Sequence, residues 1–386
     1  MARKQHNWAI FTNWINSVAI SDDGSRVVAG TYFPQSTNPN RTYGTYVYDE
    51  NGQRLFADEY NGDRGIYSVA VSADGNFAAS GGVRRDNGSG LVGLIRAFDL
   101  TTQTRILNFT NFNSRANSVA MSQDGSVLVA AAKSLFLFQR NGGGFGNPPT
   151  IFSLAGSESD SICVDPNGQW FAAGAQDGKV HLCKKNGGGV FQQSTFVTPA
   201  AGTANPQIRC VAASANGFLA AGGENGVVYV FNVNAFGGGP VAQINLTNGA
   251  QRFDVRLVGI SANAGLVVAS TNQNQPGVDT GRVFALNFNS GASTLTRKWD
   301  RQTTFGANGV SVDRSGNFVA ASDGQPFNGN HTLTPGTFYL FRGNNGDPVW
   351  DFGTSLMNWP IAVSGDGQAV ATGGDDGTIH YFDTNP

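Results

Sequence analysis

One short pattern recurs along the whole chain: a small apolar run, a tight turn that contains glycine, and a second apolar run. Its clearest copy spans residues 68–82, where Asp74-Gly75 separates two apolar segments. Glycine accepts the positive φ that a hairpin turn requires, and aspartate tolerates it. The pattern therefore predicts a β-hairpin, which on its own is only marginally stable in water.

The chain contains eight copies of this hairpin. Counted at the turn, they fall at residues 24, 75, 125, 168, 217, 264, 316 and 367, a spacing of 43 to 52 residues. This spacing is close to the period of a four-stranded propeller blade. The first strands should begin near residues 17, 68, 118, 161, 210, 257, 309 and 360. We therefore predict an all-β fold in which residues 1–386 form one domain, an eight-bladed β-propeller of four-stranded antiparallel blades.

The two ends of the chain predict how such a ring would close. The last copy ends at its third strand, residues 378–382, and residues 7–11 form a further strand before the first copy. We expect residues 7–11 to pair with the last blade as its fourth strand. Such pairing would remove an open sheet edge, which otherwise favours aggregation.

Composition excludes several classes of partner. The chain has 52 glycines, 13% charged residues and a net charge of -2, without a basic stripe, so nucleic acid is not expected as a partner. No apolar run is long enough to span a membrane, and no signal peptide is expected at the start. Membrane association is therefore not expected, and a cytoplasmic location is.

Motifs for metal, cofactor or covalent chemistry are missing from the sequence. The three cysteines, Cys163, Cys183 and Cys210, are widely spaced and lie in strand patterns, so we expect buried free thiols. The chain has no GxSxG, HExxH or P-loop motif. We expect neither a metal nor a cofactor. Among the histidines, His331 in a long loop is the one placed to act as an acid or base.

The repeats resemble those of the WD40-type propeller superfamily. The matching features are the glycine turns, an Asp-Gly pair before a third strand (Asp177-Gly178, Asp376-Gly377) and an aromatic–Asp pair such as Phe382-Asp383. Residues 285–299 also look like a repeat of quinoprotein-like propellers. No Gly-His pair precedes the first strands, so the hydrogen-bond network that this family builds on that histidine is not expected. The resemblance implies that the loops before each first strand open around the mouth of an axial channel.

The residue just before each first strand is expected to lie at this mouth. In chain order these residues are Asn16, Tyr67, Asn117, Asp160, Arg209, Arg256, Asn308 and Trp359, with Trp14 close to the first of them. The charged residues fall on consecutive copies, and the aromatic residues fall on the copies opposite in an eight-membered ring. Two arginines can hold a carboxylate or phosphate, while aromatic rings supply flat apolar contacts. The alternative is an ordinary set of polar and packing residues around a wet channel.

Loop length gives a second indication of a binding face. Four loops between second and third strands are long, near residues 33–44, 83–90, 272–281 and 323–336. Long loops on a rigid scaffold often carry binding residues. Tolerated insertion at a solvent edge is the alternative explanation.

Two functions stay open. The first is a non-catalytic binding or scaffold module that recognises a protein, a peptide or a small anionic-aromatic ligand on the loop face. The second is an enzyme (a lyase, hydrolase or isomerase) with Asp160, Arg209, Arg256 and His331 in an axial funnel. A deep closed pocket around the arginines would favour the enzyme, and a flat rim would favour the scaffold.

Overall fold

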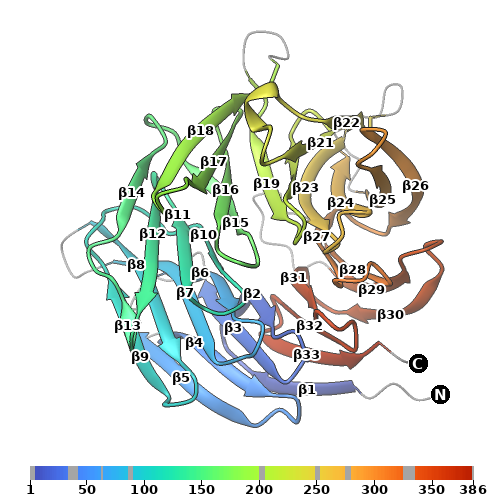
Figure 1. The fold of residues 1–386 in the computed structure, drawn as a ribbon. Helices are drawn as coiled ribbons and strands as arrows, with labels where there is room; N and C mark the ends of the chain where they lie inside the picture. The colour runs from blue at the N-terminus through green and yellow to red at the C-terminus, as the bar shows by residue number, and fades with distance from the viewer. Residues whose placement is uncertain are drawn as a thin grey trace. The chain divides into compact units, whose positions relative to one another are not determined.

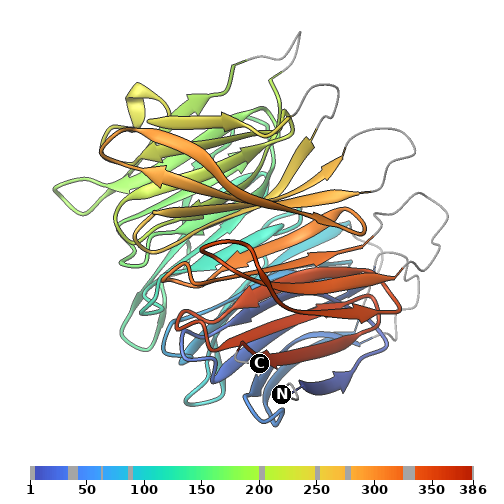
Figure 2. The same cartoon turned by 90° about the vertical axis from the view of Figure 1, so that its right-hand side faces the viewer.

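The fold is all-β and antiparallel (Figures 1 and 2). The computed structural model describes residues 5–33, 42–61, 64–85, 90–199, 205–247, 253–273, 280–324 and 335–384. Within these ranges the helical structure is one 3-10 turn, η1 (Phe236–Gly238). No helix in the described ranges is long and apolar enough to cross a membrane.

The chain divides into two compact units, Met1–Ser159 with Pro360–Asn385 (unit 1) and Asp160–Trp359 with Pro386 (unit 2). The chain passes between the units within β15 and within β31. The prediction of one domain over residues 1–386 stays a prediction.

Unit 2 is made of four-stranded sheets in which each strand pairs with the next along the chain. The strands are β15 (Ser159–Val164), β16 (Trp170–Ala175), β17 (Lys179–Lys185) and β18 (Phe191–Val197); β19 (Ile208–Ala213), β20 (Phe218–Gly223), β21 (Val227–Asn232) and β22 (Ala242–Asn245); β23 (Phe253–Ile260), β24 (Leu266–Gln273), β25 (Gly281–Asn289) and β26 (Thr294–Thr303); β27 (Ala307–Val312), β28 (Phe318–Asp323), β29 (Gly336–Arg342) and β30 (Pro348–Thr354).

Unit 1 contains the same kind of sheet, but two of its sheets are joined. The pairs Tyr32↔Gly65 and Phe33↔Arg64 link β3 to β6, so β2–β5 and β6–β9 form one eight-stranded sheet. The other sheets contain β10–β14 and, in the order β1-β33-β32-β31, both ends of the chain. The strands are β1 (Gln5–Ile10), β2 (Trp14–Ile20), β3 (Arg26–Phe33), β4 (Thr42–Asp49), β5 (Arg54–Asn61), β6 (Arg64–Val71), β7 (Phe77–Arg85), β8 (Leu91–Asp99), β9 (Thr104–Phe109), β10 (Ser118–Met121), β11 (Val127–Ala131), β12 (Ser134–Asn141), β13 (Gly144–Phe145), β14 (Thr150–Ser153), β31 (Asn358–Val363), β32 (Ala369–Gly374) and β33 (Thr378–Asp383).

The apolar residues of the repeat lie mainly in the inner strands of each sheet, which are more buried than the outer strand. Every residue of the second strands β11 and β16 is buried, whereas the outer strand β18 alternates between buried or half-buried and exposed positions for most of its length. The aromatic residue of the predicted aromatic–Asp pairs is fully buried at Phe98 and Phe382, and so is Phe231 of the similar pair Phe231-Asn232. Continuous burial suits strands that are covered on both faces, so these strands carry the core of each unit.

The hairpin turn is held by its own side chains. In the copy at residues 72–77, the Ser72 hydroxyl donates to Asp74 Oδ1 (2.6 Å) and accepts from the Phe77 N–H (2.9 Å). Gly75 has φ +68°, as the sequence pattern predicts. The copy at Ser122 and Asp124 repeats the same bonds. The serine and the aspartate recur because they satisfy backbone and side-chain groups that the tight turn leaves unpaired.

Backbone hydrogen bonds also connect neighbouring turns within a unit. In unit 1 the Asp22 N–H donates to the Ala73 carbonyl (3.0 Å) and the Ala73 N–H donates to the Gln123 carbonyl (2.8 Å). In unit 2 the Ala215 N–H donates to the Ala262 carbonyl (3.0 Å), and the Ala262 N–H donates to the Arg314 carbonyl (2.9 Å). These turn-to-turn bonds join neighbouring hairpins at positions where the side chain is free to vary.

The strand at the start of the chain pairs with the last strand. Within unit 1, β1 is antiparallel to β33, with Trp8 opposite Ile379. The Trp8 ring is 5% exposed and stacks on Tyr381 (4.7 Å between centroids) and Tyr48 (6.1 Å). β1 thus supplies the fourth strand of this sheet, while the closure of a ring by this pairing stays a prediction.

Trp8→Ala should lower the free energy of unfolding by about 3–5 kcal/mol, because it removes a large buried aromatic side chain and leaves a cavity. Trp8→Phe keeps part of the ring stack and should lose clearly less. Chemical denaturation of both variants measures the difference. An alanine variant as stable as the native chain would show that β1 does not contribute to the stability of this sheet.

The turn aspartates make stability depend on acid pH. Burial raises the pKa of Asp23 and Asp124, but hydrogen bonds from serine hydroxyls and from the turn backbone outweigh it, so both pKa values lie below 3.8. A depressed pKa stabilises the fold fully above the ordinary pKa, and that stability is lost as pH falls through the folded value. Asn216 makes the same serine bond in another copy (2.8 Å), which shows that the turn accepts asparagine.

The double variant Asp23→Asn, Asp124→Asn should therefore be less sensitive to acid. Between about pH 5 and about pH 2 its free energy of unfolding should fall by less than that of the native chain. Denaturation curves across this pH range measure the slope. Asp347→Asn, at an exposed position outside these turns, is the control and should keep the native slope. If the free energy of unfolding of the double variant fell with pH as steeply as that of the native chain, the role of the turn carboxylates would be contradicted.

Candidate functional site

Most of the residues predicted to lie at the mouth of the channel occupy β-bulges in the first strands. The register shifts at Asn16, Tyr67, Arg209, Arg256 and Asn308. The sequence placed these residues just before the first strands, and this was wrong, because the strands begin one to three residues before the bulge residue. A bulge leaves one residue out of the ladder and redirects its side chain, so these positions are set by the strand rather than by a flexible loop.

The three asparagines use this position to bond the next first strand. Asn16 Nδ2 donates to the Tyr67 carbonyl (2.9 Å), Asn117 Nδ2 to the Ser159 carbonyl (3.2 Å), and Asn308 Nδ2 to the Asn358 carbonyl (2.9 Å). Each bond joins neighbouring hairpins within one unit. These contacts give the asparagines a structural role, and their part in ligand binding stays a prediction.

The two predicted arginines form an ion cluster in unit 2 with two carboxylates. Arg209 contacts Glu224 and also Asp254, with 3.2 Å between Arg209 Nε and Asp254 Oδ1. Arg256 Nε lies 3.6 Å from Asp254 Oδ2, and the Asp254 side chain is only 8% exposed. We call Arg209, Glu224, Asp254 and Arg256 the ion cluster; its formal charges cancel.

Burial dominates the electrostatics of the ion cluster. It raises the pKa of Asp254 above 3.8, although Arg256 and Arg209 act in the opposite direction. It also lowers the pKa of Arg256. An incoming anion would compete with Asp254 for both arginines, so anion binding by this cluster stays a prediction.

Sequence analysis missed both carboxylates, and the hairpin register could have indicated one of them. Ile208 pairs with Gly223 across the β19–β20 hairpin, so Glu224 lies opposite Gln207, diagonally across the hairpin from Arg209. Asp160, expected on the same charged side, is exposed and accepts a bond from Gln176 Nε2 (3.1 Å). Trp359 is half-buried, and its carbonyl accepts a bond from the Ser322 hydroxyl (2.8 Å).

In unit 1 the structure brings Trp14 and Tyr67 into one cluster. Trp14 lies opposite Tyr32 in the β2–β3 ladder, and the Tyr32 and Tyr67 rings are 4.7 Å apart. The Arg115 guanidinium lies 5.5 Å from the centre of the Tyr67 ring. The three aromatic side chains are half-buried and Arg115 is exposed. We call Trp14, Tyr32, Tyr67 and Arg115 the aromatic patch.

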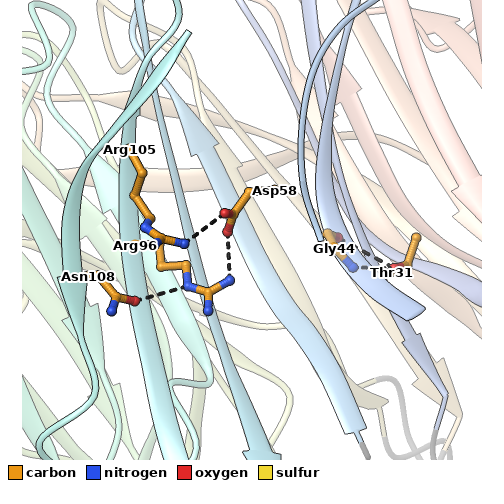
Figure 3. A network of polar contacts seen from close by, with 6 residues as sticks. All are labelled: Thr31, Gly44, Asp58, Arg96, Arg105 and Asn108. Atoms are coloured by element: carbon orange, nitrogen blue, oxygen red, sulfur yellow. Dashed lines mark hydrogen bonds and ion pairs between the residues drawn. The ribbon is translucent and has the colours of Figure 1, made fainter. Parts of the chain in front are cut away.

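The strands that carry the aromatic patch are hydrogen-bonded to their neighbours. Thr31 precedes Tyr32 in β3, and its hydroxyl accepts the Gly44 N–H (3.0 Å), which extends the β3–β4 contact beyond its last ladder pair, Gly30↔Thr45 (Figure 3). The Asn16 bond to the Tyr67 carbonyl fixes the neighbouring first strand. Sequence analysis missed Tyr32 and Arg115, although Tyr32 lies near the end of the second strand, opposite Trp14.

Unit 1 also contains a cluster of arginines, and this cluster has a structural role. Arg96 and Arg105 both bind Asp58, at 2.6 and 2.9 Å, and Arg96 Nε also donates to Asn108 (Figure 3). The Arg96 and Asp58 side chains are largely buried, at 7% and 13% exposure. Truncating one member of such a network leaves the other charges uncompensated, so this cluster ties β5 to β8 and β9 rather than offering charge to a ligand.

Other predicted features lie outside the described residues. His331 and most of the long loops fall in residues 34–41, 86–89, 274–279 and 325–334. Among the described residues, no group of three or more His, Cys, Asp or Glu side chains could hold a metal ion. The three cysteines are buried and free, as predicted, and burial raises the pKa of each thiol.

Comparison with known proteins agrees with the repeat geometry. The family model described as "WD domain, G-beta repeat" matches residues 149–183 and 341–383, the segments that contain the two Asp-Gly pairs, most of β17 and all of β33. These two segments carry WD40-type repeats, which are the repeats of WD40-type β-propellers. The resemblance predicted from the sequence is thereby confirmed.

Solved structures support the same fold at low identity. The structure of U3-55K is 14% identical with a TM-score of 0.60, over 82% of this chain and 90% of that one. The Myceliophteria thermophila Cps50 (Swd1) β-propeller domain is 16% identical with a TM-score of 0.58, over 82% and 96%. A chain of the mitotic checkpoint complex is 14% identical with a TM-score of 0.59, over 99% and 91%. No curated protein matches the WD40-type chain by sequence.

Arg209→Ala combined with Arg256→Ala should lower the free energy of unfolding by about 1–3 kcal/mol at neutral pH. The double substitution leaves the buried Asp254 carboxylate without a cationic partner from either arginine. The arginine side chains are 29% and 33% exposed, so the loss should fall below that of a fully buried pair. Without the arginines the pKa of Asp254 should rise further, and stability should recover as pH falls through that pKa.

Chemical denaturation at several pH values tests this recovery. The triple variant that adds Asp254→Asn is the control, because it has no carboxylate to protonate at this position. A stability loss that does not change with pH in the double variant would contradict the interpretation of the ion cluster.

Proposed function

We propose that this chain is a non-catalytic interaction scaffold that binds a protein or peptide through the aromatic patch. The observation that carries the proposal is the convergence of Trp14, Tyr32, Tyr67 and Arg115 on rigid strands, with all four side chains partly or fully exposed. Trp, Tyr and Arg are the residue types that dominate binding energy at protein interfaces.

The rigidity of the patch favours binding. Its aromatic residues lie at strand ends or at a bulge, and their strands are bonded to neighbours through Asn16 and Thr31. Side chains that are already ordered lose little entropy when a partner docks. The exposed Arg115 suits a partner segment with a carboxylate or phosphate next to an apolar or aromatic side chain.

The blade arrangement is part of the proposal. We infer that the eight-stranded sheet represents two blades, β2–β5 and β6–β9, because the link between them is only the two pairs at β3 and β6. With the other sheets this makes an eight-bladed propeller. The β1–β33 pairing would then close the ring by completing the last blade.

The comparisons support a scaffold role in a general way. One structural neighbour is a chain in a mitotic checkpoint complex, which is an assembly of proteins. The alternative, an enzyme in the axial funnel, finds no support among the described residues: Arg209 and Arg256 are held by Glu224 and Asp254.

Selection from a displayed random peptide library tests the aromatic patch. Peptides selected on the native chain should bind Trp14→Ala and Arg115→Ala at least about tenfold more weakly, a loss of about 1.4 kcal/mol. Fluorescence polarisation with labelled peptides measures the affinities, and thermal unfolding checks that each variant is folded.

Arg301→Ala is the matched control. Arg301 also lies over an aromatic ring, 5.9 Å from the centre of Trp299, but in unit 2. It should bind selected peptides as the native chain does. Peptides that bind all variants equally would refute the aromatic patch as the binding site.

A further inference from the structure

The ion cluster contains buried polar atoms that make no hydrogen bond to any described residue. Arg209 Nε lies 3.2 Å from Asp254 Oδ1, and Arg256 Nε lies 3.6 Å from Asp254 Oδ2. Among the described residues, neither arginine Nε nor Asp254 Oδ1 has a hydrogen-bond partner of normal geometry. A buried polar group that is left unsatisfied destabilises the fold, so several together need an explanation. Charge attraction holds this cluster, and part of its hydrogen-bonding capacity is unused.

Asn272 places an amide on the same face of the sheet as Asp254. The two residues lie directly opposite each other in the β23–β24 ladder, where Cβ atoms are about 5 Å apart. Asn272 is 7% exposed, and neither atom of its amide bonds to a described residue. Gly306 leaves space for this amide, because a Cβ at Gly306 would lie 2.5 Å from Asn272 Oδ1. Buried groups without partners are where an ordered water molecule or a bound ion is expected.

We propose that the ion cluster and Asn272 form a site for a small tetrahedral oxyanion of the sulfate or phosphate class, and that protonation of Asp254 opens this site. A protonated Asp254 no longer competes for Arg209 and Arg256, so both guanidinium groups can bind the anion. The formal charge of the cluster then changes from 0 to +1, because two arginines face one remaining carboxylate. At neutral pH the cluster has no net charge, and an anion would have to displace Asp254.

The donors suit a tetrahedral anion better than a planar carboxylate. They come from three strands, with Arg209 on β19, Arg256 on β23 and Asn272 on β24. Donors on separate strands approach an anion from different directions. The oxygens of a tetrahedral anion also point in different directions, whereas the two oxygens of a carboxylate lie in one plane. Both arginine side chains are partly exposed, so an anion can reach them from solvent.

Asp254 is the carboxylate that controls the site, because it is the more buried of the two. Its side chain is 8% exposed, compared with 31% for Glu224. Burial raises the pKa of Asp254 above 3.8 although both arginines act against it, and Glu224 raises it further. The neighbouring strands β20 and β27 contain no charged residue. The Cys210 thiol on β19 stays protonated because burial raises its pKa, and Asn272 on β24 is neutral. Asp254 therefore gains a proton at a higher pH than an exposed aspartate does.

Calorimetric titration of the full chain with sulfate tests the proposal. Sulfate stays fully ionised across the tested range, so a change of affinity at constant ionic strength reports the protein. The native chain should bind sulfate at least about tenfold more tightly at about pH 4.5 than at about pH 7.5, because only the protonated form is competent. By linkage, binding to the ionised form should take up a proton. Titrations in two buffers of different ionisation heat measure that uptake.

Asp254→Asn keeps the shape of the side chain and removes its charge at every pH. This variant should bind sulfate at about pH 7.5 with an affinity within about threefold of the native affinity in acid, and without proton uptake. Adding Arg256→Ala should remove the binding. Sulfate should also raise the melting temperature of the asparagine variant at neutral pH, which would show that the folded form binds it. The pH dependence of the native chain tests the proposal independently of these variants.

Asp300→Asn is the matched control. Asp300 also contacts two arginines in unit 2, Arg282 and Arg297, but its side chain is 20% exposed. This variant should gain no sulfate affinity at neutral pH, and Glu224→Gln should still bind sulfate more tightly in acid. Equal affinity at both pH values in the native chain, or equal gains in Asp254→Asn and Asp300→Asn, would overturn the proposal. So would a loss of pH dependence in Glu224→Gln, or acetate that binds as tightly as sulfate.

Discussion

Neighbouring hairpins in this chain are joined by hydrogen bonds between their turns and between their first strands. A hairpin alone does not bury enough surface to be stable, and the turn-to-turn bonds at Ala73 and Ala262 are made by backbone atoms only. The asparagine bonds at Asn16, Asn117 and Asn308 add a side-chain link on the first strand. Because the backbone bonds do not depend on the side chain, these connections survive wide variation in sequence.

Proline is the residue that these backbone bonds do not tolerate, and it occurs at one turn. Pro166 occupies the position of Ala73 and Ala215 in its own copy of the repeat, and it has no N–H to donate. Asp165 accepts the Gln169 N–H (3.0 Å) and so replaces the serine at this turn. The turn itself therefore persists where the donor of one turn-to-turn bond is missing, which indicates that local side-chain bonds and inter-hairpin bonds contribute separately.

The repeat was predictable because turn chemistry and apolar alternation are local. Gly75 needs positive φ and Phe98 is the buried half of an aromatic–Asp pair, and both follow from spacing alone. The partners of Arg209 were not predictable in the same way, because Asp254 belongs to the next repeat. The bulges were missed because an extra residue in a strand leaves little trace in a pattern of period two.

The bulges explain how the same positions can serve either as structural links or, as proposed for Tyr67, in recognition. At Asn16 the bulge residue bonds the neighbouring strand, whereas at Tyr67 it presents a half-exposed ring next to Tyr32. The backbone has a bulge in both cases. A change of side chain at this position can therefore replace a hydrogen bond to the next strand by an exposed ring, without a change of fold. An interaction site can therefore differ between blades while every blade keeps its turn and core, and the site has to be argued from its particular side chains rather than from the fold.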